Sequence, residues 1–145
     1  MENDRFDPLK LDNQLCFPLY ACAREVVKRY KPFLDDVDLT YTQYVTMMVL
    51  WEKGSVTSKE IGERLHLDSG TLTPVLKKLA EKGLVTRCRC PEDERNLSVT
   101  LTDAGRALRE RAVDIPGQVG RCIRLTPQEA MQLYNLLYKL LGSME

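Results

Sequence analysis

The residues with the clearest capacity for chemistry are five cysteines, Cys16, Cys22, Cys88, Cys90 and Cys122. A thiolate is both a nucleophile and a metal ligand, so such a set could serve redox, zinc or disulfide chemistry. The odd count, together with an expected cytoplasmic location, argues against a disulfide framework. The chain has one histidine, and Cys88 and Cys90 are too close together for the usual zinc spacing. We therefore expect no metal and no other cofactor.

Cys16 differs from the other cysteines because Pro18 follows it two residues later. Proline fits the first turn of a helix and damages its interior, so a helix should begin close to Gln14–Phe17. A helix N-terminus lowers the pKa of a thiol there and favours the reactive thiolate. The residues alone are also compatible with Cys16 as a small buried apolar side chain.

A second chemical signal is a segment of hydroxyl and basic side chains between residues 69 and 95. Small polar residues open a predicted amphipathic helix, and basic residues follow on that helix and on a predicted hairpin. Such a helix could enter the DNA major groove while the basic residues contact phosphate. The same pattern could be an ordinary helix cap and a solvated turn. The candidate DNA contacts are Ser69, Thr71, Thr73, Lys77, Lys78, Arg87, Asp93 and Arg95.

The elements that would position these residues are mainly helical. Apolar residues at spacings of three and four predict helices, and alternation over residues 84–90 and 96–101 predicts two strands joined by a charged tip. Further helices are expected from Thr40 to Gly54, from Thr57 to near His66, from near Ser69 to Gly83, from Thr102 to about Cys122 with a bend at Pro116–Gly117, and from Thr126 onward. This order of helices and hairpin predicts a winged helix-turn-helix, mainly α with a small β-hairpin wing.

Composition places few further limits on function. The 145 residues are 43% hydrophobic and 29% charged, and the 21 basic residues balance the 21 acidic ones. A zero net charge disfavours a general polyanion binder but is compatible with sequence-specific DNA binding. No apolar run is long enough to cross a membrane, and we expect a cytoplasmic protein.

Several motifs resemble one known family. Asp68–Pro74, Lys82–Val85 and Glu92–Arg95 are similar to the recognition helix, strand entry and wing of MarR-type regulators, with Asp93 and Arg95 matching the wing motif. Leu11–Phe17 and Thr40–Tyr44 resemble the organic hydroperoxide regulators (OhrR type) within that family, and the similarity extends over residues 3–117. The resemblance implies a homodimer with a helical dimerisation region at 10–36 and 103–145, and a winged DNA-binding region at 40–101.

The resemblance also implies roles for particular residues. Cys16 matches the peroxidatic cysteine, Tyr30 and Tyr41 match tyrosines that donate hydrogen bonds to its thiolate from the partner subunit, and Tyr20 matches a further tyrosine near that pocket. Some relatives resolve the oxidised cysteine with a second cysteine late in the fifth helix, and others with a small thiol. Cys122 resembles the former, which implies a disulfide between Cys16 and the partner's residue at position 122.

The function expected is a transcriptional repressor that releases a pseudo-palindromic operator when an organic hydroperoxide oxidises Cys16. One alternative keeps the fold and replaces the oxidant by a small aromatic ligand. Another is a thiol peroxidase, but the sequence has no thioredoxin-like pattern, no Cys-x-x-Cys and no paired catalytic groups. We therefore expect a regulator and not an enzyme.

Overall fold

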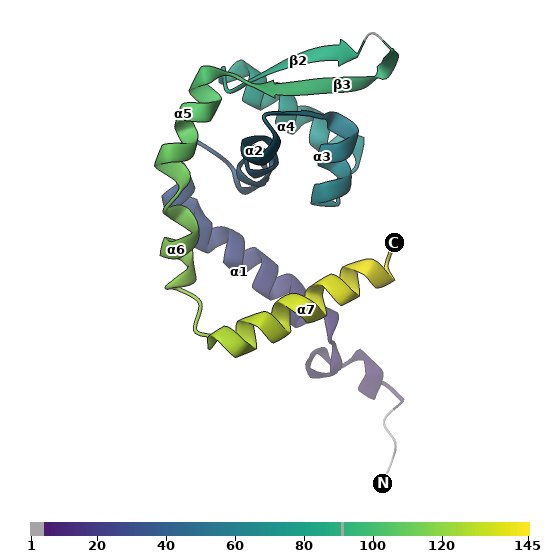
Figure 1. Ribbon diagram of the computed structural model, residues 1–145. Helices are drawn as coiled ribbons and strands as arrows, with labels where there is room; N and C mark the ends of the chain where they lie inside the picture. The colour runs from purple at the N-terminus through teal and green to yellow at the C-terminus, as the bar shows by residue number, and fades with distance from the viewer. Residues whose placement is uncertain (1–4, 91) are drawn as a thin grey trace. The chain divides into compact units, whose positions relative to one another are not determined.

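The computed structural model describes residues 5–90 and 92–145, and for residues 90 and 93–95 the backbone alone. Figure 1 shows the element order. Two 3-10 turns, Asp7–Leu9 and Leu11–Asn13, come first. The helices and strands are α1 (Cys16–Asp35), α2 (Tyr41–Lys53), β1 (Ser55–Thr57), α3 (Ser58–Leu65), α4 (Ser69–Glu81), β2 (Val85–Cys90), β3 (Asp93–Leu101), α5 (Asp103–Ala112), α6 (Ile115–Gly120) and α7 (Pro127–Ser143).

Threonine side chains begin four of these helices, as the sequence predicts. Thr40 and Thr126 form complete capping boxes at α2 and α7. Thr57 caps α3 and Thr102 caps α5. In the first turn of α3 the Glu60 carboxylate accepts a hydrogen bond from Lys53 of α2. Each cap satisfies an amide that has no partner inside the helix. The predicted helix starts are therefore confirmed.

The chain forms two compact units, one ending at Ile115 and the other spanning Pro116–Glu145. The core of the first unit consists of apolar side chains from α2, α3, α4 and the sheet. Met47, Leu50, Ile61, Leu79 and Val99 are all completely buried there. This shared core fixes α4 relative to the wing, so the helix-turn-helix and the hairpin form one body.

Within the described residues the sheet has three antiparallel strands in the order β1-β3-β2, where the sequence predicts two. The hairpin of β2 and β3 is confirmed, and β1 adds Val56 opposite Val99. Three residues are too few to show an alternating pattern, and β1 lies between helix-ending Gly54 and helix-capping Thr57.

The single helix predicted from Thr102 to about Cys122 is wrong, because the structure divides it into α5 and α6. The break at Val113 and Asp114 precedes Pro116, which is the second residue of α6. Proline has no amide hydrogen to continue a preceding helix, but it fits the first turn of a new one. The predicted bend is therefore a break that lies slightly earlier.

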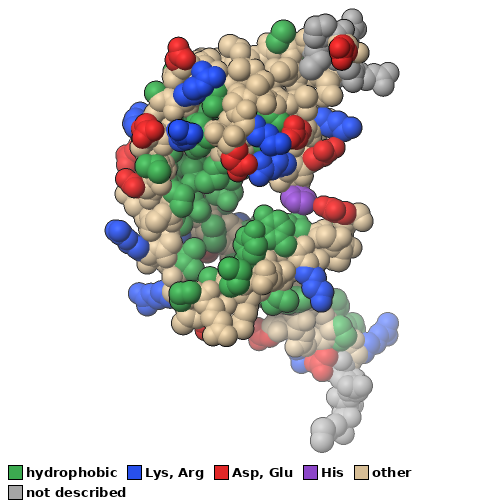
Figure 2. Space-filling model, viewed as in Figure 1, with side chains coloured by type: hydrophobic (Ala, Val, Ile, Leu, Met, Phe, Trp, Pro, Cys, Tyr) green, Lys and Arg blue, Asp and Glu red, His purple; other side chains and the backbone are tan. Residues whose placement is uncertain are grey.

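The long helices at the two ends of the chain have large exposed apolar side chains. None of the residues of α7 is buried, and hydrophobic side chains lie along it in Figure 2. On α1, Phe17, Leu19 and Val27 are exposed. No helix within residues 5–90 and 92–145 combines the length and apolar character that crossing a bilayer requires.

Candidate functional site

Helix α4 begins at Ser69 because Asp68 caps it. The Asp68 carboxylate accepts a hydrogen bond from the Thr71 amide at 2.7 Å. This backbone hydrogen bond is the main reason that the pKa of Asp68 lies below its usual value. The cap fixes the first turn, where the small polar residues predicted to read DNA are located.

The two faces of α4 differ sharply. Leu72, Leu76 and Leu79 are buried in the core. The predicted contacts Ser69, Thr71, Thr73, Lys77 and Lys78 are all exposed. The Thr73 hydroxyl donates to the Ser69 carbonyl oxygen at 2.7 Å, so it remains available as an acceptor. The structure thus presents these five residues to solvent from one helix.

The wing contributes a second basic surface. Arg87 is exposed on β2, opposite Val99 of β3. Arg87 and Arg89 line a shallow groove with Ala80 of α4 and Leu97 of β3. The predicted side-chain contacts of Asp93 and Arg95 lie outside the described residues.

Cys16 is the first residue of α1, and its thiol is free and exposed. Pro18 occupies the third helical position, which confirms the predicted start. Tyr20 follows one turn later and is 59% exposed, with the Arg24 guanidinium 5.5 Å from its ring centre. Residues four apart share one side of a helix, so Cys16 and Tyr20 are neighbours.

Tyr30 and Tyr41 gather in a second place together with Tyr44, and we call these three residues the tyrosine cluster. The ring centroids are 5.0 Å apart for Tyr30 and Tyr41, 5.8 Å for Tyr30 and Tyr44, and 6.2 Å for Tyr41 and Tyr44. Burial raises the pKa of Tyr30 and Tyr41, and it raises the pKa of Tyr44 to about 12. All three hydroxyls therefore keep their protons at neutral pH and can act as donors.

A single chain does not bring Cys16 to the tyrosine cluster. Fourteen residues of the same helix separate Cys16 from Tyr30, which at 1.5 Å per residue is about 21 Å. Cys122 belongs to the second unit, and its thiol is also free and exposed. The prediction that Cys122 lies in a helix is wrong, since α6 ends at Gly120 and Cys122 follows in a turn.

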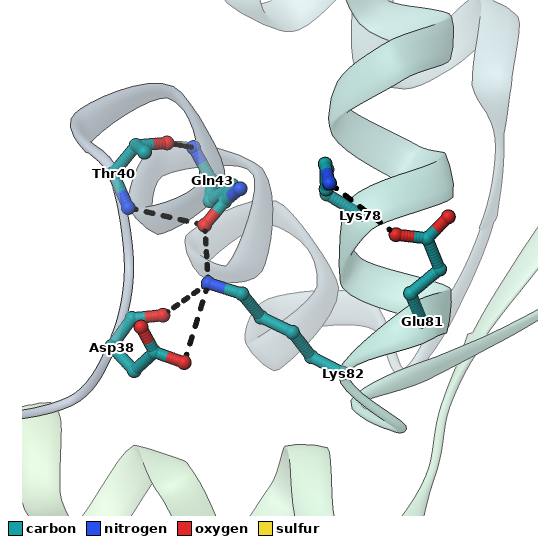
Figure 3. A network of polar contacts seen from close by, with 6 residues as sticks. All are labelled: Asp38, Thr40, Gln43, Lys78, Glu81 and Lys82. Atoms are coloured by element: carbon teal, nitrogen blue, oxygen red, sulfur yellow. Dashed lines mark hydrogen bonds and ion pairs between the residues drawn. The ribbon is translucent and has the colours of Figure 1, made fainter.

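Sequence reasoning missed two residues near the cluster. Tyr44 is only 1% exposed, and among the described residues its hydroxyl has no hydrogen-bond partner. The sequence could have indicated that Tyr44 lies beside Tyr41, because the two are three residues apart at a capped helix start. Lys82 follows α4 and binds Asp38 and Gln43 at the beginning of α2 (Figure 3). No sequence pattern indicates this contact, because 39 residues separate Lys82 from Gln43.

Comparison with known proteins identifies the family. A family model described as transcriptional regulator SarA/Rot matches residues 28–111. An organic hydroperoxide resistance transcriptional regulator of Bacillus subtilis (strain 168) is 49% identical over 144 residues, covering 99% of this chain and 97% of the relative. This chain belongs to the MarR family of transcriptional regulators. The resemblance to this family is confirmed, as is the expectation of a regulator and not an enzyme.

Solved structures agree with the fold of this MarR-family regulator. Reduced AbfR bound to DNA is 34% identical with a TM-score of 0.78, over 94% of this chain and 96% of that chain. Disulfide-formed AbfR is 35% identical with a TM-score of 0.65, over 97% of this chain and 99% of that one. AbfR is a protein of Staphylococcus epidermidis. The predicted winged helix-turn-helix is therefore confirmed.

Proposed function

We propose that this regulator is a homodimeric repressor that binds a pseudo-palindromic operator and releases it when an organic hydroperoxide oxidises Cys16. The separation of an exposed thiol at one end of α1 from protonated tyrosine hydroxyls near the other end carries this proposal. A second subunit whose α1 runs in the opposite direction would bring the two together.

The exposed apolar side chains support the homodimer. A contiguous apolar surface of several hundred Å² is unusual on a monomer and marks an interaction site. On α7 the exposed apolar residues are Met131, Leu133, Leu136 and Leu140, together with Tyr134 and Tyr138, whose tilted rings lie 4.7 Å apart. We assign these residues, together with the exposed apolar residues of α1, to the dimer interface.

Operator binding is assigned to α4 and the wing. The exposed hydroxyls of Ser69, Thr71 and Thr73 suit base edges and phosphates in the major groove, and Lys77 and Lys78 suit the flanking phosphates. On the wing, Arg87 is assigned to phosphate, while Asp93 and Arg95 retain the roles expected from the wing motif. The structure of reduced AbfR bound to DNA, which is 34% identical to this chain, supports a DNA-binding role.

The redox step begins at Cys16. Its thiolate attacks one oxygen of the hydroperoxide, and the O–O bond breaks. The other oxygen leaves with its organic group as the alcohol after taking up a proton, and Cys16 becomes a sulfenic acid. Hydrogen bonds from the partner's Tyr30 and the partner's Tyr41 would stabilise the thiolate, and Tyr20 would lie beside it.

The second step is a disulfide between Cys16 and the partner's Cys122. The Cys122 thiolate attacks the sulfenic sulfur, the S–O bond breaks, and the departing hydroxide takes up a proton to become water. The disulfide-formed AbfR structure supports a covalent oxidised state in this family. A non-reducing gel after peroxide treatment should show a covalent dimer that Cys122→Ser abolishes. Its persistence in that variant would assign the step to another thiol.

The test of the function is operator binding before and after cumene hydroperoxide. Wild type should bind when reduced and release when oxidised, whereas Cys16→Ser should bind in both conditions. Equal release by Cys16→Ser would disprove the role of Cys16 and leave DNA binding intact. Release by a salicylate-like compound and not by peroxide would instead favour the ligand-gated alternative.

A further inference from the structure

A lysine at the end of α4 reaches across to the start of α2. The Lys82 ammonium donates to the Gln43 side-chain oxygen at 3.0 Å and to the Asp38 carbonyl oxygen, and lies 3.7 Å from the Asp38 carboxylate (Figure 3). Its side chain is only 26% exposed. A partly buried ammonium that donates two hydrogen bonds beside a carboxylate holds a more defined geometry than an ion pair between two fully exposed side chains.

The segment that Lys82 binds is conformationally strained. Asp38 has a φ of 52°, in the left-handed region that residues other than glycine rarely occupy. Such a conformation persists only where the surroundings determine it. Here Val37 and Leu39 are buried on either side, and Arg111 of α5 donates to the Asp36 carbonyl oxygen at 2.5 Å. Cations from α4 and α5 therefore hold the junction between α1 and α2.

The same lysine also holds the first turn of α2. The Gln43 side-chain oxygen that accepts from Lys82 also accepts from the Thr40 backbone amide at 3.1 Å. In return, the Gln43 backbone amide donates to the Thr40 hydroxyl at 3.3 Å. This capping box sets the turn that carries Tyr41 and Tyr44. A shift of those tyrosines would therefore move the acceptors of Lys82, which lies one residue beyond the end of α4.

We propose that Lys82 is a positioning residue that couples the tyrosine cluster to helix α4 through Asp38 and Gln43. The inference rests on the proposed function, in which the cluster receives the partner's Cys16 and α4 binds the operator. Coupling of this kind is reciprocal, so operator binding should also stabilise the first turn of α2.

Hydrogen exchange of the reduced full-length protein tests this coupling without any oxidant. Saturating operator duplex should slow exchange at the Gln43 and Tyr44 amides at least fivefold in wild type. Lys82→Met keeps the apolar stem of the side chain and should reduce that slowing to less than twofold. Lys53→Met, at the other end of α2 and bound to Glu60, is the matched control and should behave like wild type.

Two results would overturn the role of Lys82: the same slowing in Lys82→Met as in wild type, or no slowing in wild type. If Lys82→Met fails to fold, Gln43→Met removes an acceptor from the other side of the contact and should show the same loss. A second readout is the ratio of operator Kd after and before oxidation, which should fall at least fivefold in Lys82→Met. Failure of wild type to release DNA on oxidation would reject the proposed function, while the exchange comparison still decides on Lys82.

Discussion

The winged region and the two terminal helices differ in how far their apolar side chains are buried within one chain. From α2 to α5 the large apolar side chains are buried within one chain, and Tyr44, Met47, Leu50 and Val99 are almost inaccessible. On α1 and α7 side chains of the same kind are exposed, with Leu136 at 63%. The winged region is therefore complete in one chain, whereas the apolar faces of the terminal helices are the surfaces that the proposed dimer would cover. The proposed thiol site combines Cys16 of α1 with tyrosines near the winged region, so it too would depend on the dimer.

Gly105→Ala should have the largest effect on stability, because Gly105 lies in the winged region, whose core is buried within a single chain. A Cβ at Gly105 would lie 2.1 Å from the Leu84 carbonyl oxygen, a backbone atom that already accepts from the Thr102 amide. We expect a loss of about 3 kcal/mol in the free energy of unfolding by urea. Gly142→Ala on α7 is the control, since no atom of the described residues lies within 4 Å of a Cβ added there. Equal stabilities of the two variants would contradict the close packing of α5 on the wing.

Leu136→Glu tests the terminal helices and should weaken the dimer. Leu136 is exposed in the single chain, so the change should leave the monomer fold unaffected. Burying a charge at the interface should raise the dimer dissociation constant about 100-fold, or about 2.7 kcal/mol. Sedimentation or light scattering against a Gln132→Glu control measures it. A dimer of unchanged affinity would remove α7 from the interface.

Tyr44→Phe tests the core of the winged region and should stabilise the protein, by less than Gly105→Ala destabilises it. It removes a buried hydroxyl that has no partner in the part of the chain that the structure describes, and keeps the ring. The free energy of unfolding should therefore rise by about 1 kcal/mol. Tyr30→Phe provides the comparison, since Tyr30 as a residue is less buried than Tyr44. Destabilisation by Tyr44→Phe would show that the hydroxyl has a partner in the dimer.

The smallest effect concerns the cap of α4. The pKa of Asp68 is lower when folded, so its charge stabilises the fold above the unfolded pKa of about 3.9, and this contribution is lost as pH falls through the folded pKa. Asp68→Asn keeps a capping oxygen without the charge and should remove that dependence. Urea unfolding of the variant and wild type from neutral pH down to pH 3 measures it. Parallel curves for the two proteins would contradict the role of the charge.

Local signals in the sequence were sufficient for most of the fold. Thr40, Thr57, Thr102 and Thr126 cap helices through contacts three residues away, and Pro18 fixes the start of α1. β1 and the break before Pro116 were missed because a three-residue strand has no period and a proline allows either a bend or a new start. The tyrosine cluster and the Lys82 contacts depend on tertiary packing, which residue spacing does not encode. The assignment of Cys16 depended on resemblance, because its thiol is free and exposed and lies far along α1 from the tyrosine cluster.

The central claim is that each thiol site is completed by the partner subunit, and mixed dimers test it most directly. One chain is Cys16→Ser, and the other is Tyr30→Phe with Tyr41→Phe. If the site forms between subunits, the only remaining Cys16 faces intact tyrosines on its partner. Mixed dimers should then react with cumene hydroperoxide at the wild-type rate, with half the wild-type number of reactive thiols. A rate no faster than that of the doubly substituted homodimer would contradict the account.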